Sequence, residues 1–198
     1  MPIDVPPYMQ ERIVCSIAAA AKYEIPANVL LAVAEKENGR VGQWVLNSSN
    51  GSHDVGPLQF NTNYLRELAQ YGIAPSHVAA AGCYPFDLAA WRLRKHIRYD
   101  TGDLWTRVAN YHSRTPQFNQ VYRTDLMVRA AKWADWLGKH YQTHDQAMAG
   151  ATGQAGTAGA ALPAPVAAPA TAPATPSVKY VPRRLIVSAS AAPAGETR

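Results

Sequence analysis

The residue best placed for acid–base chemistry is Glu37, near the end of a short apolar segment over residues 28–39. Leu30, Val33 and Ala34 recur in this segment at helical spacing. Glu37 follows Val33 by four residues, so its carboxyl group continues the apolar face of the predicted helix. A carboxyl group is unusual on a buried face, which makes Glu37 the first candidate for chemistry.

Two effects raise the pKa expected for Glu37. Asn28 is suited to cap the start of the helix and Gly39 to follow its end, which places Glu37 in the last turn, where the helix dipole opposes a carboxylate. Partial burial acts in the same direction, and a carboxyl group protonated near neutral pH can serve as a general acid in glycosidic cleavage. The alternative is a structural glutamate that pairs with an arginine. Glu35, about 200° around the helix, is expected at the solvated surface.

A second polar segment spans residues 50–61, with the sequence Asn-Gly-Ser-His-Asp-Val-Gly-Pro-Leu-Gln-Phe-Asn. Its Asn-Gly pair is a turn signal between two apolar stretches, so residues 42–61 are predicted to form a small β element or a long loop. Asp54 is the other carboxylate of this region. It is either a second catalytic group or a side chain that stabilises the Asn- and Gly-rich turn.

Apolar periodicity and capping residues predict that most of the remaining chain is helical. In the first helix, Val14, Ile17 and Ala21 are expected on one buried face. The predicted helices cover residues 9–23, 28–39 and 61–71, a short turn from 75, a longer helix from 85, one from 103 and the longest from 116. Basic residues of the helix from 85 are expected on its solvated face: Arg92, Arg94, Lys95 and Arg98. The fold class is therefore mainly α (α+β).

Residues 146–198 differ in composition from the rest of the chain. From residue 146 to 177 the chain is almost entirely Ala, Gly, Thr and Pro, without aromatic or charged residues, so it cannot bury enough apolar surface to fold. We expect one domain over residues 1–145 and a disordered tail, in which residues 178–187 are either a short docking segment or unstructured chain. The domain holds 15 of the 19 basic and 13 of the 14 acidic residues, and this net charge of +2 does not favour nucleic-acid binding.

Three segments in order resemble the motifs of the lytic transglycosylase family, which has a lysozyme-like fold. They are residues 37–39 (Glu-Asn-Gly), residues 50–61, and residues 109–113 (Ala-Asn-Tyr-His-Ser). The family carries Glu-Ser at a helix end, then Gly-Leu-Met-Gln, then Ala-Tyr-Asn. The second segment is similar to the Asn-Gly-Ser-x-Asp-x-Gly loop of the small transglycosylases of type IV secretion, conjugation and pilus systems. The resemblance covers about residues 10–140 and implies a lysozyme-like helical domain.

The resemblance implies a role for each matching residue. Glu37 is the general acid, the Gln59 amide contacts N-acetyl groups of the substrate, and the Tyr111 hydroxyl orients Glu37. Without the motif order, Gln59 is a loop-closing amide and Tyr111 an ordinary core tyrosine. Further substrate-binding residues expected from the motifs are Asn38, Asn61 and His112. No Cys or His has metal-ligand spacing with His112, so neither a metal ion nor a cofactor is expected.

The sequence departs from the family pattern at three places. Asn38 replaces Ser, Pro57-Leu58 replaces Leu-Met, and His112 replaces the Asn after the tyrosine. None of these changes removes the acid, although each alters an expected contact with the sugar chain.

The implied reaction is cleavage of the β-1,4 bond between N-acetylmuramic acid and N-acetylglucosamine, with formation of 1,6-anhydromuramic acid ends. A lone glutamate suits this reaction, since most glycosidases need two carboxylates. The implied partners are peptidoglycan strands and the secretion, conjugation or pilus machine for which the wall is opened. Two alternatives are a non-catalytic peptidoglycan-binding scaffold of the same machine and a hydrolytic muramidase with Asp54 as base.

Cys15 and Cys83 do not identify a redox compartment by number alone, and two reduced core thiols are one interpretation. Small transglycosylases of the kind this sequence resembles tend to join cysteines at these two places, so the resemblance implies a disulfide and a periplasmic or other extracytoplasmic location. No apolar run is long enough to span a membrane. The apolar residues 13–21 follow Asp4 and Glu11 rather than positive charge, so no signal peptide is evident.

Overall fold

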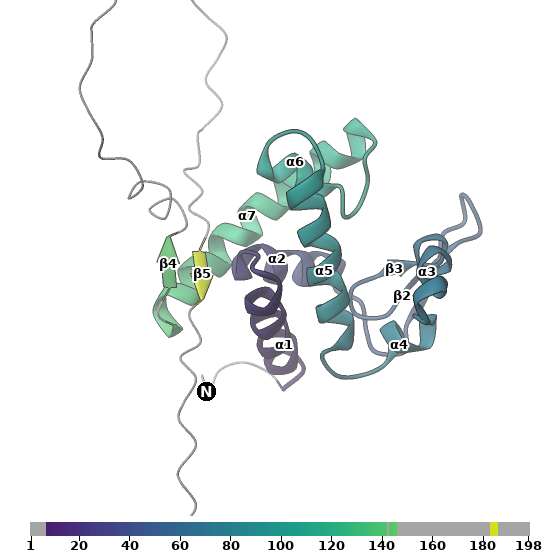
Figure 1. Cartoon of the computed structure of the whole chain (residues 1–198), viewed down its shortest axis with the longest axis horizontal. Helices are drawn as coiled ribbons and strands as arrows, with labels where there is room; N and C mark the ends of the chain where they lie inside the picture. Colours follow the sequence, from purple (N-terminus) through teal and green to yellow (C-terminus); the bar gives the residue numbers. More distant parts are fainter. Residues whose placement is uncertain (1–6, 142, 146–182, 186–198) are drawn as a thin grey trace, which may run out of the picture.

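The computed structural model describes residues 7–141, 143–145 and 183–185 (Figure 1). Helices make up most of this part, and short antiparallel strands complete it. The predicted fold class, mainly α with a small β element, is confirmed. The elements are α1 (Pro7–Tyr23), α2 (Ala27–Glu37), β1 (Trp44–Leu46), β2 (His53–Val55), β3 (Phe60–Asn61), α3 (Thr62–Leu68), the 3-10 helix η1 (Ala69–Tyr71), α4 (Pro75–Ala79), α5 (Tyr84–Tyr99), α6 (Leu104–Ala109), α7 (Pro116–His140), β4 (Thr143–Asp145) and β5 (Arg183–Leu185).

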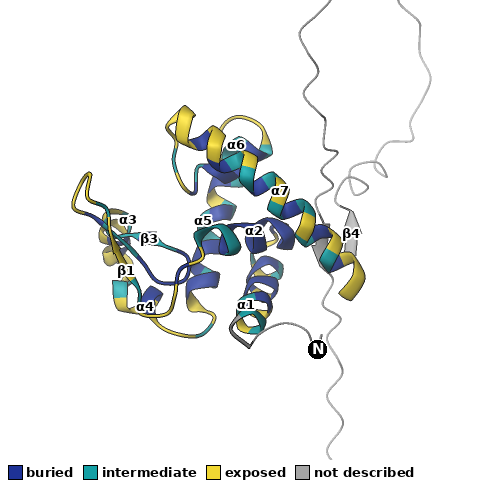
Figure 2. Cartoon of the chain, turned by 180° about the vertical axis from the view of Figure 1, so that it is seen from behind, coloured by how far each residue is buried: buried dark blue, intermediate teal, exposed yellow. Residues whose placement is uncertain are grey.

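Helix α2 lies at the centre of the helical part and is buried along most of its length (Figure 2). Helices α1, α5 and α7 pack against it. Residues 27–34 are all buried, and all but one of them are apolar, which is the pattern of a helix surrounded by other helices. Because Glu37 is the last residue of this central helix, its carboxyl group lies at the edge of the core.

Two local predictions for the first helices are wrong. Asn28 does not cap α2: it lies inside the helix, and its buried amide donates a hydrogen bond to the Ala130 carbonyl oxygen of α7 at 3.2 Å. Val14 is 46% exposed. The buried face of α1 instead includes the preceding residue, Ile13, together with Ile17. In both cases the packing between helices decides the outcome.

The predicted β element over residues 42–61 is a three-stranded antiparallel sheet in the order β1–β2–β3. Asp54 lies at the middle of the central strand, opposite Val45 on one side and Asn61 on the other. Asn61 also caps α3 as predicted, since its side-chain oxygen accepts a hydrogen bond from the Asn63 backbone N–H at 3.0 Å. The sheet therefore places Asp54 and Asn61 side by side.

A disulfide joins Cys15 of α1 to Cys83, the residue just before α5, with their Cα atoms 4.9 Å apart. The expected pairing is thus present, and it links two helices that pack side by side. The bridge spans 68 residues of sequence.

Of the predicted tail, residues 146–182 and 186–198 lie outside the described residues. Within the predicted docking segment 178–187, strand β5 pairs antiparallel with β4, which follows α7. In the described part of the chain, no helix combines the length and the hydropathy that a bilayer span requires.

Candidate active site

Glu37 is half-buried at the C-terminal end of α2, where a tyrosine of another helix meets it. The hydroxyl of Tyr122, on α7, donates a hydrogen bond to Glu37 Oε1. Burial raises the pKa of Glu37 from 4.5 to about 7, against the opposing effects of the Tyr122 hydrogen bond and the charge of Arg92. The negative charge of Asp54 adds to the rise. The carboxyl group is therefore poised to exchange a proton near neutral pH.

Tyr111, expected to orient Glu37, does not make this contact. Its buried hydroxyl donates instead to the Leu58 carbonyl oxygen at 3.0 Å. It thus supports the backbone of the loop that follows β2, and the contact with Glu37 falls to Tyr122. Tyr111 lies in the turn after α6, whereas Tyr122 lies on α7, and no spacing in the sequence pairs Tyr122 with a residue 85 positions earlier.

His112 stacks in parallel on the ring of Tyr122, with ring centroids 4.7 Å apart and an angle of 4° between the planes. Burial lowers the pKa of His112 below its ordinary value, so the imidazole is neutral at neutral pH. The stacked pair supports the orientation of the hydroxyl that contacts Glu37.

Asp54 is held by two amides. The side chains of Asn47 and Asn61 donate to its two carboxylate oxygens at 3.0 and 2.9 Å, and both also donate to the Ser52 hydroxyl. Since the charge of Asp54 raises the pKa of Glu37, the two carboxyl groups belong to one electrostatic site. Sequence reasoning placed Asp54 and Asn61 in this region but missed Asn47. The one signal for Asn47 was weak, namely that it is an asparagine shortly before the Asn-Gly turn.

The loop after β2 presses against the end of α2. A Cβ atom on Gly39 would come within 2.1 Å of the Gly56 carbonyl oxygen and 2.5 Å of Gln59 Nε2, so only glycine fits there. Gln59 takes a left-handed backbone conformation, φ 49°, and its amide nitrogen donates to the Gly56 carbonyl oxygen at 2.8 Å. This bond closes the loop, which is the structural alternative considered for Gln59.

Arg12 fixes the last turn of α2, a role that the sequence did not indicate. Its guanidinium donates to the carbonyl oxygens of Ala34 and Gly39 at 2.9 and 3.0 Å and to the side-chain oxygen of Asn38 at 3.3 Å. Asn38 is exposed in a left-handed conformation, φ 45°. Arg12, Asn38 and Gly39 line a pocket of about 770 Å³ directly after Glu37, which leaves Asn38 accessible to a ligand.

Two surface predictions near the site are wrong. Glu35 is not merely solvated: its carboxylate pairs with Arg129 and accepts a hydrogen bond from the Trp133 indole at 2.7 Å, both on α7. Arg92 is not on a fully solvated face: it is half-buried, and its guanidinium lies 4.2 Å from the ring centroid of Tyr64 and 4.5 Å from that of Tyr111. The arginine pairing considered for Glu37 is thus found at Glu35, because α7 crosses α2 at that side.

Metal-binding side chains do not gather near Glu37. Across the described residues, His, Cys, Asp and Glu form no group of three or more arranged to hold a metal ion. The side chains described around Glu37 carry carboxyl, hydroxyl, amide and imidazole groups.

No family model matches the chain. The sequence is similar to Protein IpgF of Shigella flexneri, with 31% identity over 102 residues, and to Protein IpgF of Shigella sonnei, with 32% identity over 103 residues. Each alignment covers 51% of this chain and 66% of the relative, so the chain spans slightly less than two thirds of the relatives' length. The names of these relatives state no activity.

Proposed function

We propose that this protein is a peptidoglycan lytic transglycosylase in which Glu37 is the catalytic residue. The observation that carries the proposal is a half-buried carboxyl group at the end of the central helix, with its pKa raised to about 7 and a tyrosine hydroxyl bound to one oxygen. Such a group can give up a proton and take one back within a single reaction at neutral pH. The motif resemblance around Glu37, Gln59 and Tyr111 supplies the substrate class.

In the proposed reaction, protonated Glu37 donates its proton to the glycosidic oxygen between N-acetylmuramic acid and N-acetylglucosamine, and the bond from C1 to that oxygen breaks. The acetamido group of the muramic acid stabilises the positive charge that develops at C1. The Glu37 carboxylate then removes the proton of the 6-hydroxyl, whose oxygen bonds to C1. The product has a 1,6-anhydro end, no water is consumed, and Glu37 is protonated again.

Neighbouring groups have supporting roles in this proposal. Tyr122 holds Glu37 in place through its hydrogen bond, and His112 holds Tyr122 by stacking. Asp54, fixed by its two amide partners, stabilises positive charge at C1 electrostatically. Asn38 and Gln59 are the proposed sugar contacts on the two sides of Gly39.

The second candidate is a hydrolytic muramidase, which is favoured by the electrostatic coupling of Asp54 to Glu37. A carboxylate held by two amides beside a general acid is suited to activate water or to bind C1. The two reactions differ in their products, because hydrolysis leaves a reducing end where transglycosylation leaves an anhydro end.

We further propose that the enzyme opens the wall locally for a secretion, conjugation or pilus machine outside the cytoplasm. The motif resemblance to the small transglycosylases of such systems and the disulfide support this assignment.

Digestion of purified sacculi, followed by mass analysis of the released fragments, tests the activity. We expect anhydro ends from the wild type and none from Glu37→Gln, which is nearly isosteric but cannot donate the acidic proton. Glu35→Gln is the matched control, because it also removes from α2 a carboxylate whose partners lie on α7. Reducing ends would favour the muramidase, and binding without release would favour the scaffold. Equal activity of the wild type and Glu37→Gln would refute the role of Glu37, and equal loss of activity in both variants would indicate a general effect on stability.

A further inference from the structure

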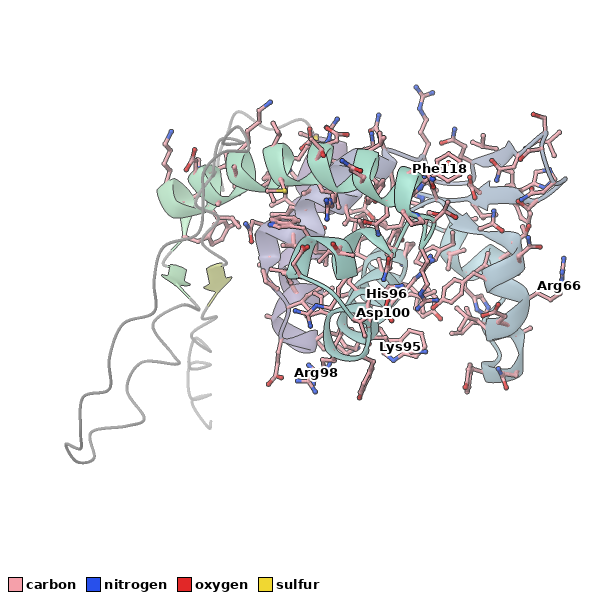
Figure 3. The ribbon with its side chains drawn as sticks, turned by 90° about the horizontal axis from the view of Figure 1, so that it is seen from above. Arg66, Lys95, His96, Arg98, Asp100 and Phe118 are labelled. Carbon is pink, nitrogen blue, oxygen red and sulfur yellow. A yellow bond between two sulfur atoms is a disulfide. The ribbon has the colours of Figure 1, made fainter. Side chains whose placement is uncertain are left out.

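A polar pocket of about 440 Å³ lies between α3, α5 and the segment after α6. Its volume is within the range of small-molecule sites. The side chains that matter for its charge are Glu67, Arg92, Lys95, Asp100 and Arg114. Figure 3 labels Lys95, His96 and Asp100, which line this pocket, and Arg98 of the same helix, which does not.

Arg92 is the half-buried cation of this pocket. Its guanidinium lies against the rings of both Tyr64 and Tyr111, which orient its plane. Among the residues that the structure describes, no carboxylate forms an ion pair with Arg92. A guanidinium held by aromatic rings, with no carboxylate bound to it, is a ready site for a planar anion.

The acidic residues of the pocket do not cancel this charge. Asp100 is already bound by His96 at 2.7 Å, by the Asn110 amide at 2.7 Å and by Arg114 at 3.0 Å. These hydrogen bonds hold the pKa of Asp100 at about 2, although desolvation acts against them. Glu67 is exposed at the rim. The cations left to bind a ligand are Arg92 and Lys95.

Lys95 lies with its ammonium 4.7 Å from the Trp91 ring centroid. Like Arg92, it has no ion-pair partner in the described part of the chain. It thus offers a second positive group on the same helix, one turn from Arg92.

The pocket adjoins the Glu37 site. Asn61 lines the pocket and also donates to Asp54. The charge of Arg92 acts on Glu37 itself, whose pKa it lowers. A substrate bound at Glu37 and Asp54 therefore has a neighbouring place for an anionic branch.

We propose that this pocket binds a carboxylate of the peptide stem carried by N-acetylmuramic acid, with Arg92 as the main contact and Lys95 as a second one. The inference rests on the proposed function for its substrate class. Carboxylates are the anionic groups of the stem, and an arginine fork binds a carboxylate through two parallel hydrogen bonds. The protein would thereby prefer strands that still carry their peptides.

The test compares two ligands that differ only in charge. One is the disaccharide N-acetylglucosaminyl-N-acetylmuramic acid with a stem peptide that has free carboxylates, and the other is the same compound with every carboxyl group converted to its amide. Neither contains the bond that the enzyme is proposed to cleave, so calorimetry with the active protein measures binding alone. We expect roughly tenfold tighter binding of the carboxylate form, the effect of a hydrogen bond to a charged group.

Arg92→Gln should abolish this preference, and Arg98→Gln, the matched loss of a positive charge from α5, should retain it. Because Arg92 contacts two tyrosines, its variant is first checked for an unchanged thermal transition. Lys95 touches neither tyrosine, so Lys95→Gln remains a valid test even if the Arg92 variant does not fold. It should reduce the preference about two- to threefold.

Equal affinity of the wild type for both ligands would overturn the inference, as would an equal loss for both in Arg92→Gln or no measurable binding of the carboxylate form. Sacculus digestion separates these failures from those of the proposed function. A protein that cleaves sacculi without the preference lacks only the stem site, whereas one that shows the preference without cleavage lacks only the activity.

Discussion

The raised pKa of Glu37 predicts a specific dependence of stability on pH. Folding raises this pKa from 4.5 to about 7, which corresponds to about 3 kcal/mol if each pKa unit is worth about 1.4 kcal/mol. The native protein thus holds the proton more tightly than the unfolded chain. Its contribution to stability is complete below pH 4.5 and is lost as the pH rises through 7.

Glu37→Gln should remove this dependence, because the amide is neutral at every pH and can still accept the Tyr122 hydrogen bond. The variant's free energy of unfolding, minus that of the wild type, should therefore increase by about 3 kcal/mol between pH 4 and pH 8. Above neutral pH, Glu37→Gln should therefore have the higher free energy of unfolding. Urea unfolding of both proteins at each pH provides the difference.

Other titratable groups, such as His96, whose pKa is lowered by burial, are common to both proteins and cancel in the difference. A difference between Glu37→Gln and the wild type that does not change with pH would show that Glu37 is solvated, and would remove the basis for its role as a general acid.

Three further predictions concern the surroundings of Glu37. Tyr122→Phe removes a hydrogen bond that lowers the pKa of Glu37, so the alkaline limb of sacculus cleavage should move up by about one pH unit in a pH–rate profile. Replacement of Cys15 and Cys83 by serine should lower the free energy of unfolding by roughly 4 kcal/mol in urea titrations, because the bridge closes a loop of 68 residues. Gly39→Ala should cost about 2–3 kcal/mol in the same assay, since its Cβ would meet a loop carbonyl oxygen at 2.1 Å. An unshifted limb, an unchanged midpoint after cysteine replacement, or a fully stable alanine variant would contradict the respective argument.

Features that depend on neighbouring residues were predictable from the sequence. Helical periodicity located the helices, and Asn61 and Asp103 cap α3 and α6 as their residue types suggest. The Asn-Gly turn located the small sheet. The position of Glu37 at the end of an apolar helix predicted a raised pKa, and burial is the main cause of the rise. The helices, their caps and the turn follow from contacts within a few residues along the chain, and the burial of Glu37 was predictable because it continues the apolar face of its helix.

The partners of the polar groups were not predictable in this way. Periodicity indicates which side of a helix is buried but not which residue of another helix it meets. Thus Tyr122 rather than Tyr111 contacts Glu37, and Arg92 lies on tyrosine rings instead of in solvent. These contacts depend on how whole helices are rotated and shifted against one another.

The crossing of α2 and α7 decides the site most directly. Their packing brings Tyr122 to Glu37, joins Arg129 to Glu35 and places the Asn28 amide on an α7 carbonyl oxygen. The sequence by itself determined that α2 is apolar and ends in a carboxyl group. Only the tertiary structure determined which side chains surround that carboxyl group, because helices far apart in the sequence come together where their combined burial is most favourable, and their polar groups pair in the register that this packing imposes.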